Sequence, residues 1–216
     1  MGAVDAWMEV LTLIEDCKLD DKHYCGGAAD IAKFFDQIRR DLVYRMARAG
    51  GMPEPVITAY TSYLENLMVY NCLAGGVGSA FRRSCGIPQG CPFSMVIVAM
   101  IMRPWILMMR TFTGIKCYIL ADDVLIVATG KHMAANFAKA LNATRLYLHK
   151  MGAKVAPTKS YNFASHPKAR RWISKVKWDN IAESIEVVTD FRYLGAHITT
   201  TNSTTSTTMD DRVAKP

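Results

Sequence analysis

Two adjacent carboxylates, Asp122 and Asp123, lie inside an otherwise apolar run that spans residues 117–128. Like charges repel and burial disfavours ionisation, so this pair is costly in a strand unless a cation neutralises it. A hard divalent ion such as Mg2+ binds through one or two carboxylates plus substrate phosphates. An Asp-Asp pair can also be a plain surface turn, but the apolar flanks Leu120 and Val124 argue against that. The pair therefore predicts two strands joined in a hairpin whose tip carries a metal site.

The charge distribution around the pair predicts a polyanionic partner. Between residues 66 and 178, Asp122 and Asp123 are the only acids, whereas Lys and Arg number sixteen. From residue 124 to 178 there are eleven Lys or Arg residues, interspersed aromatics and no acid. Such a block is typical of a surface that binds nucleic-acid phosphates. A solvated basic surface without a specific partner is the alternative that charge leaves open.

The composition predicts a folded, intracellular protein. The chain has 216 residues, of which 50% are hydrophobic, enough for one domain and an appended segment. Its six cysteines form no C-x-x-C pair and are expected to be reduced, which does not distinguish nucleus from cytoplasm. The acidic N-terminus is unlike a signal peptide. The apolar stretch 95–109 is interrupted by Arg103-Pro104, which predicts a core helix and no membrane partner.

Apolar spacing predicts an α+β fold, an antiparallel sheet with helices packed on one face. The stretch 86–90 is expected to be a loop, followed by a Met-rich helix with Ser94 as N-cap. The Thr- and Ser-rich end, residues 199–216, is expected to be disordered. The other expected helices cover residues 4–17, 36–49, 55–70 and 132–151. The expected strands cover residues 28–35, 79–85, 117–127, 154–156, 161–164, 172–178, 185–188 and 191–198.

A second source of carboxylates is needed if two metal ions bind, because ions about 3.5–4 Å apart are held from more than one segment. Asp30 is the best candidate, since it follows the small residues 26–29. The alternative for Asp30 is an ordinary acid at a strand edge.

Five segments resemble, in order, the motifs of reverse transcriptases, and all of them lie within residues 26–198. The nearest subgroup resembles the enzymes of non-LTR retrotransposons, with group II intron enzymes next. The segment 191–195, Phe-Arg-Tyr-Leu-Gly, favours the retrotransposon group. The five segments are Asp30–Asp36, Gly86–Ser94, Leu120–Asp123, Gly152–Lys159 and Phe191–Gly195.

The resemblance implies a metal site. Asp30 and Asp122 would hold two Mg2+ ions, with Mn2+ as an alternative. Asp123 would assist them, and the backbone carbonyl of Ile31 would add a ligand.

The resemblance also implies substrate contacts. Phe34 and Phe35 would lie at the incoming nucleotide, where the Phe35 ring would stack under the sugar and exclude a 2′-OH. The alternative interpretation is that Phe35 is an ordinary core residue. Lys159 would protonate the leaving pyrophosphate. The alternative interpretation is that Lys159 is one more basic residue at the surface. The template–nucleotide pair would contact Pro88, Gln89 and Gly90. The primer-side hairpin would contain Tyr193, Leu194 and Gly195.

By resemblance, residues 26–198 form a polymerase palm, preceded by a lead-in over residues 1–25 and followed by the tail 199–216. The implied function is RNA-directed DNA polymerase activity, a two-metal transfer of a nucleotide from dNTP to a primer 3′-OH. The implied partners are an RNA template, a DNA primer or RNA–DNA hybrid, and dNTPs. The source is expected to be a retroelement, and the chain a part of a longer polyprotein that supplies fingers and thumb.

The chain departs from the family pattern in two places. Leu120 stands where an aromatic usually precedes Ala-Asp-Asp, and Met95 stands where proline commonly follows the serine. Three alternative functions stay open: a non-catalytic nucleic-acid-binding remnant, an RNA-directed RNA polymerase and a metal-dependent nuclease. Phe35 argues against the RNA polymerase, and the loop 86–94 has no obvious role in a nuclease.

Overall fold

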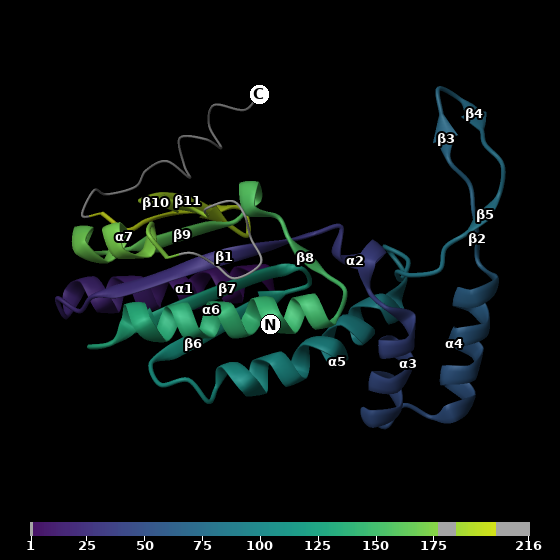
Figure 1. Ribbon diagram of the computed structural model, residues 1–216, viewed down its shortest axis with the longest axis horizontal. Coiled ribbons are helices and arrows are strands. Elements are labelled where there is room, and N and C mark those ends of the chain that lie inside the picture. Colours follow the sequence, from purple (N-terminus) through teal and green to yellow (C-terminus); the bar gives the residue numbers. More distant parts are fainter. Residues whose placement is uncertain (1, 177–184, 202–216) are drawn as a thin grey trace. The chain divides into compact units, whose positions relative to one another are not determined.

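The computed structural model describes residues 2–176 and 185–201 (Figure 1). The chain divides into two compact units. The first comprises residues 1–31, 106–146 and 155–216, and the second comprises residues 32–105 and 147–154.

A six-stranded sheet forms the first unit's centre, in the order β10-β9-β1-β7-β6, with β8 paired to β1. The pairs β9–β1, β1–β7 and β7–β6 are antiparallel, and β9–β10 is parallel. The α+β class and the antiparallel hairpin are therefore confirmed. The strands are β1 (Tyr24–Ala32), β6 (Ile115–Leu120), β7 (Asp123–Thr129), β8 (Lys154–Val155), β9 (Tyr161–Ala164) and β10 (Glu186–Val188).

The central strand β1 begins at Tyr24, four residues earlier than predicted, so Gly26 and Gly27 lie inside the strand. A Cβ atom on Gly26 would lie 2.4 Å from the carbonyl oxygen of Ile126, and one on Gly27 would lie 2.4 Å from Oδ1 of Asn162. The two glycines thus allow the neighbouring strands to approach β1 closely.

Helices cover both faces of this sheet, so the expectation of helices on one face is wrong (Figure 1). On one face, α1 (Ala3–Leu19) packs Val10 and Ile14 into a core with Leu125 of β7. The same face carries the hairpin of β11 (Asp190–Tyr193) and β12 (Ala196–Thr199). On the other face, Phe137 of α6 (Met133–Lys150) lies against Gly27. Successive residues of β1 point to opposite faces, which lets a single strand serve both layers.

The second unit is mainly helical. It contains α2 (Phe34–Gln37), α3 (Arg40–Ala49), α4 (Glu54–Asn66) and most of α5 (Pro92–Met109). The guanidinium of the buried Arg40 donates to the carbonyl oxygens of Gly86 (3.0 Å) and Leu64 (2.9 Å), which ties α3 to the end of α4 and to the loop 86–90. Two short strand pairs follow α4: β2 (Met68–Val69) with β5 (Phe81–Arg82), and β3 (Cys72–Leu73) with β4 (Gly76–Val77).

Two predicted helices and one predicted N-cap differ from the structure. The helix expected over 36–49 is split into α2 and α3, and the one expected over 55–70 ends at Asn66. Ser94 is not an N-cap: α5 begins at Pro92, and the Ser94 hydroxyl donates to the carbonyl oxygen of Pro88 at 2.6 Å. The hydroxyl therefore fastens the preceding loop instead of the helix end.

The strand expected over 172–178 is wrong, because residues 167–173 form the helix α7 (Pro167–Ile173). Pro167 occupies its first turn, and the Nδ1 atom of His166 caps it by accepting from the Lys168 N–H. Ala169 and Ile173, four residues apart, form its buried face. Residues 177 and 178 lie outside the described residues.

The expectation of a disordered tail over residues 199–216 is wrong for Thr199 and Thr200. Thr199 ends β12, and the backbone N–H of Thr200 donates to the carbonyl oxygen of Thr189 at 2.8 Å. Both threonines are buried. The rest of the predicted tail, residues 202–216, lies outside the described residues.

Among the described residues, α5 is one helix long and apolar enough to cross a membrane by length and composition. One side of α5 is buried within the protein, with Ile97, Ile101 and Trp105 at most 1% exposed. Arg103 and Pro104 are exposed. One side of α5 is thus part of the core, whereas Met95, Val96 and Leu107 are exposed.

Candidate active site

The hairpin of β6 and β7 carries the Asp-Asp pair at one end of the sheet. Leu120 pairs with Asp123, which leaves Ala121 and Asp122 as a two-residue loop. Ala121 has a φ of 55°, a left-handed backbone conformation that residues other than glycine rarely adopt. A positive φ at the first loop residue is the feature of a type II′ hairpin turn. Asp122 therefore lies at the tip, and Asp123 is the first residue of β7.

Asp30 of β1 lies directly opposite Asp123 of β7 in the antiparallel register. Opposed residues of an antiparallel pair project to the same face, with Cβ atoms about 4.5–5.5 Å apart. The structure thus brings together the two segments that the sequence analysis selected, although Asp123 lies 93 positions after Asp30 in the sequence. Asp30 and Asp123, from two paired strands, therefore lie at one end of the sheet, and Asp122 adjoins them in the hairpin loop.

Hydrogen bonds from the segment 156–160 hold the backbone of Asp30. The Ala156 N–H donates to the Asp30 carbonyl oxygen at 2.9 Å, and the Asp30 N–H donates to the Ser160 hydroxyl at 3.1 Å. That hydroxyl donates in turn to the Ala156 carbonyl oxygen at 2.8 Å. Ser160 was not predicted as a site residue, because a serine beside a lysine carries no signal in the sequence.

Lys159 ends a short 3-10 helix, η1 (Pro157–Lys159), beside Asp30. Its Nζ atom lies 3.8 Å from Oδ2 of Asp30, and its side chain is 75% exposed. An ion pair this exposed is weak, so the ammonium group is held near Asp30 while remaining free to contact a substrate.

A pocket of about 230 Å3 opens beside these charges. Asp30, Asp123 and Lys159 line it together with Tyr161, Arg192 and Tyr193, among others. The Tyr161 hydroxyl donates to the carbonyl oxygen of Arg192 at 3.0 Å, which joins β9 to the β11–β12 hairpin. Leu194 and Gly195 form the turn of that hairpin, both with positive φ. The predicted primer-side segment is thus a hairpin whose first strand borders the carboxylates.

Burial of its carboxylate raises the pKa of Asp123 above the ordinary value of 3.8, and the negative charges of Asp122 and Asp30 raise it further. The ionised form of Asp123 is therefore disfavoured in the metal-free protein. A bound cation would favour the ionised form by neutralising the three charges.

We expect the metal-free protein to lose stability, relative to its Asp123→Asn variant, as pH rises. Folded Asp123 binds its proton more tightly than the unfolded chain does. The stabilisation is therefore complete below the unfolded pKa and is lost as pH rises through the folded pKa. Urea denaturation in EDTA, from about pH 3 to pH 7, measures the difference. Saturating Mg2+ should abolish the loss, and a difference that is constant across this range would contradict the expectation.

The donor set fits Mg2+ better than a transition metal. In the described residues, no group of three or more His, Cys, Asp or Glu side chains is arranged to hold an ion. Mg2+ does not need such a cage, since it is usually bound by one or two carboxylates plus water and substrate phosphates. The opposed pair Asp30 and Asp123, with Asp122 at the tip, supplies the hard oxygen ligands for that mode.

The hydroxyl of Tyr193 supports a separate prediction. The Tyr193 side chain is 3% exposed, and its hydroxyl has no hydrogen-bond partner within residues 2–176 and 185–201. An unpaired buried hydroxyl costs about 1–3 kcal/mol. Tyr193→Phe is therefore expected to raise the free energy of unfolding by about 1 kcal/mol. Tyr161→Phe, which removes the bond to Arg192, is the matched control and should lower it by a similar amount. Equal effects of the two variants would contradict the prediction.

Ile31 follows Asp30 in β1 of the first unit, with a buried side chain, whereas the predicted nucleotide and template contacts lie in the second unit. Phe34 is 1% exposed and packs edge-on against Phe35, with ring centroids 5.7 Å apart. Phe35 is partly exposed, and its carbonyl oxygen accepts from the Ile87 N–H at 2.8 Å. Within this unit the structure thus brings Phe35 beside the loop 86–90. Phe35 is thus the more accessible of the two phenylalanines.

The loop 86–90 is shaped by its first glycine. Gly86 has a φ of 86°, and a Cβ atom there would lie 2.8 Å from the carbonyl oxygen of Asp36. Only glycine allows this approach. Gln89 and Gly90 are exposed and Pro88 is partly buried. Arg83, which was not predicted, forms an ion pair with Asp36 and adds a further link to the same segment.

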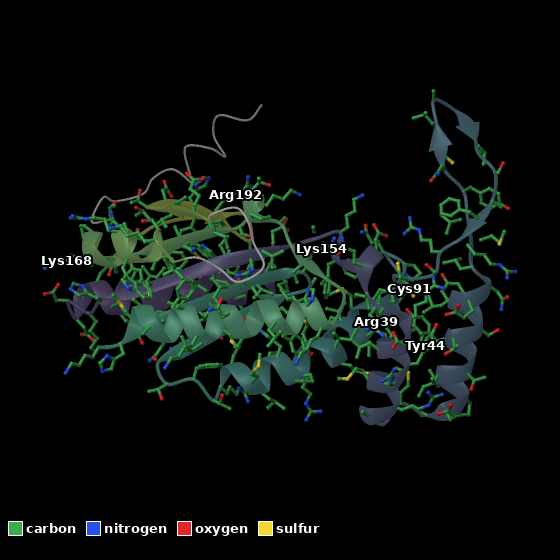
Figure 2. All side chains as sticks on the ribbon, viewed as in Figure 1. Arg39, Tyr44, Cys91, Lys154, Lys168 and Arg192 are labelled. Carbon is green, nitrogen blue, oxygen red and sulfur yellow. The ribbon has the colours of Figure 1, made fainter. Side chains whose placement is uncertain are left out.

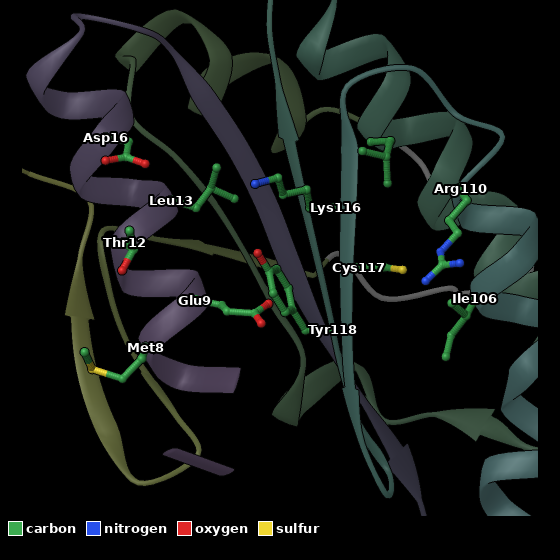
Figure 3. A pocket seen from close by; sticks show the side chains of 11 residues that line it. Met8, Glu9, Thr12, Leu13, Asp16, Ile106, Arg110, Lys116, Cys117 and Tyr118 are labelled. Atoms are coloured by element: carbon green, nitrogen blue, oxygen red, sulfur yellow. The ribbon is translucent and has the colours of Figure 1, made fainter. Parts of the chain in front are cut away.

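A larger pocket of about 590 Å3 lies in the first unit between α1 and the edge strand β6 (Figure 3). Glu9 and Asp16 of α1 line it on one side, where Lys116 of β6 points toward α1. The free thiol of Cys117, the next residue of β6, points to the opposite side, toward Arg110. None of the predicted site residues lines it. The smaller pocket, which gathers the carboxylates, is therefore the candidate active site.

The model of the family described as reverse transcriptase (RNA-dependent DNA polymerase) matches residues 5–198. No curated protein matches the chain. Among solved structures, apo telomerase from Candida tropicalis, truncated from its C-terminal domain, is similar with a TM-score of 0.59 and 14% identity, covering 88% of this chain and 38% of that one.

Two further telomerase structures, each in complex with the TWJ fragment of telomeric RNA, are also similar. The Candida tropicalis protein has a TM-score of 0.61 at 14% identity, and the Candida albicans protein has 0.60 at 11%. In both cases the match covers 89% of this chain and 32% of the other. At these identities the likeness concerns the fold alone. The chain spans about a third of the length of these structures.

Proposed function

We propose, on the premise that this chain belongs to the reverse transcriptase family, that it carries out RNA-directed DNA synthesis with a palm-type active site. The observation that carries the proposal is the register that sets Asp30 opposite Asp123, beside Asp122 at the hairpin tip. Carboxylates at a sheet end, within a chain whose neighbouring segments are basic, suit a reaction between a metal-bound triphosphate and a nucleic acid.

Asp30 and Asp122 would hold two Mg2+ ions, Asp123 would assist them, and the Ile31 carbonyl would add a ligand. Mg2+, when bound, lowers the pKa of the primer 3′-OH and neutralises charge on the leaving pyrophosphate. The protein's own share is positioning. The bonds from Ala156 and Ser160 fix the Asp30 backbone, and the two-residue loop fixes Asp122. Rigid placement of ligands before the reaction is what gives electrostatic catalysis its effect.

The substrate contacts are proposed from the family resemblance of their segments and from the local structure within each unit. The partly exposed Phe35 would stack under the incoming sugar, supported from behind by the buried Phe34. Gln89 and Gly90 would contact the template–nucleotide pair, with Pro88 stiffening their loop. The hairpin turn at Tyr193, Leu194 and Gly195 would contact the primer. The proposed partners are an RNA template, a DNA primer or RNA–DNA hybrid, and dNTPs.

Lys159 would donate a proton to the pyrophosphate, since its ammonium group lies 3.8 Å from Oδ2 of Asp30 and is exposed. We expect Lys159→Ala to lower the single-turnover rate of nucleotide addition by about 10²-fold, the lower end of general-acid effects. Nucleotide affinity should change much less. Lys139→Ala, which removes an exposed lysine from α6, is the control and should leave the rate unchanged. A Lys159 variant that only weakens nucleotide binding would contradict the proton-donor role.

Primer extension on an RNA template, with Mg2+ and dNTPs, tests the proposed function. The wild type is expected to extend the primer, and the Asp122→Asn/Asp123→Asn double variant is expected not to. A parallel reaction with rNTPs tests the alternative of an RNA polymerase. If folded wild-type protein extends no primer with either nucleotide, the proposal fails and a non-catalytic nucleic-acid-binding remnant takes its place.

We also propose a retroelement origin of the non-LTR type, which the sequence Phe191–Gly195 supports. An intracellular location is supported by the cysteines, all six of which are free.

A further inference from the structure

The outer face of α7 carries an exposed tryptophan between cations. Lys168, Arg171, Trp172 and Lys175 are exposed, and Trp172 has 44% of its surface accessible. Their spacings of three, four and seven residues place them on one face of a helix. Lys175 follows in the turn that closes α7, where its N–H donates to the Trp172 carbonyl oxygen at 3.1 Å. A large aromatic is left in solvent although Ala169 and Ile173 of the same helix are buried.

The helix that presents this face is firmly attached to the sheet. The Arg170 guanidinium donates to the carbonyl oxygens of Ala164 (2.7 Å) and Ser165 (3.0 Å) at the end of β9. His166 caps the first turn, and its ring lies 4.7 Å from that of His23, between centroids. Arg170 is thus used for structure, whereas the outward cations are free to meet a ligand in a preorganised arrangement.

This face is distant from the candidate active site within the same unit. Ala164, at the α7 end of β9, pairs with Cys25 of β1, and Asp30 lies five residues further along β1. At about 3.3 Å per residue the two ends of this strand segment are about 17 Å apart. In Figure 2, Lys168 lies at the left-hand edge of the view and Arg192, which lines the active-site pocket, lies well to its right. A ligand on α7 would therefore not compete for the carboxylates.

The other described residues of the basic block 124–178 do not place an exposed aromatic between exposed cations. Phe163 is fully buried, and Tyr161 is partly buried with its hydroxyl bonded to Arg192. Arg145 is 8% exposed. Lys131, just before α6, and Lys139 and Lys150, within α6, are exposed without an exposed aromatic between them. The charge pattern of the sequence is thus resolved into structural cations, scattered surface lysines and one organised face.

We propose that the α7 face binds an unpaired stretch of nucleic acid, with a base stacked on Trp172 and phosphates held by Lys168, Arg171 and Lys175. Stacking on an exposed aromatic flanked by cations is how sequence-tolerant single-strand sites work. The absence of any acid between residues 124 and 178 leaves the phosphates unopposed along this segment. The site lies apart from the catalytic one and would guide a strand before or after it passes the carboxylates.

Fluorescence anisotropy tests the proposal by measuring how the full chain binds single-stranded RNA, single-stranded DNA and a duplex. The measurements are made in EDTA over a series of salt concentrations. Omitting the metal separates this test from catalysis, so it can succeed where primer extension fails. The triple variant Lys168→Gln/Arg171→Gln/Lys175→Gln should lower the slope of log affinity against log salt by about 2 for a single strand. The control Lys116→Gln/Lys131→Gln/Lys139→Gln removes three exposed lysines elsewhere in the unit and should change it by less than about 0.7.

Variants of Trp172 test the stacking part of the proposal. Trp172→Ala should weaken single-strand binding by about tenfold and leave duplex binding unchanged, because paired bases cannot stack on it. Trp172→Phe should restore most of the affinity. Thermal melts establish that each variant is folded. Equal slopes for the two triple variants would overturn the proposal, as would a Trp172→Ala effect that is the same on single strands and duplex. Loss of binding to anionic lipid vesicles, with nucleic-acid binding intact, would assign the face to a membrane instead.

Discussion

Replacing Asp30 with asparagine is expected to reduce primer extension by about three orders of magnitude or more while leaving the fold intact. Asp30 is the carboxylate that β1 contributes opposite Asp123, and its backbone is held on both sides by the segment 156–160. Asparagine keeps the shape but removes the charge that would bind Mg2+. Metal ions supply several kcal/mol of transition-state stabilisation, and each ~1.4 kcal/mol is a factor of ten in rate.

Single-turnover primer extension measures this effect. Asp190→Asn is the matched control, because Asp190 is an exposed acid on β11 of the same unit and lies 4.0 Å from Nδ1 of His197. The control should retain the wild-type rate. Metal-free Asp30→Asn should unfold at a urea concentration equal to or above that of the wild type, because it removes one of the charges that repel Asp123. An Asp30→Asn rate within tenfold of the control would exclude Asp30 as a metal ligand.

Gly26→Ala is expected to have the largest effect on stability, a loss of about 3 kcal/mol, at the upper end of the cost of overpacking a core. The new Cβ atom would lie 2.4 Å from the Ile126 carbonyl oxygen and 2.6 Å from the Phe163 ring. The Ile126 oxygen belongs to the backbone of β7, which is paired on both sides and cannot move aside. The strain should therefore reach the hairpin that carries Asp122.

Urea denaturation of Gly26→Ala beside Gly76→Ala tests this expectation. Gly76 lies in β4 with ordinary contact to its nearest neighbour, 3.5 Å from the Leu73 carbonyl oxygen, so its variant should stay within about 0.5 kcal/mol of the wild type. Equal free energies of unfolding for the two variants would contradict the close packing of β1 against β7.

Much of the site could be predicted from the sequence because its signals are local. The apolar runs on both sides of Asp122 and Asp123 predict a hairpin, and a two-residue loop needs no distant partner. The predicted hairpin tip is confirmed. Asp30 was selected by the small residues before it, and the structure places it beside the pair. The five family motifs lie within the residues that the family model matches.

Other features depend on residues far apart in the sequence, so no local pattern could predict them. Which of Phe34 and Phe35 is buried follows from the packing of the second unit. The buried role of Arg40 requires a carbonyl group 46 residues away. The helix α7 was mistaken for a strand because Trp172, an apolar residue, faces solvent there.

The chemistry of the site therefore follows from the amino-acid types and their local spacing, whereas the arrangement of the site follows from the fold. Carboxylate oxygens prefer hard cations, and basic residues prefer phosphate, wherever they stand in a chain. Whether a given charge meets a ligand, a carbonyl oxygen or water depends on which strands pair and which faces are covered. Pairing of β1 with β7 sets Asp30 against Asp123, and packing of α7 on β9 directs Arg170 inward and Lys168 outward.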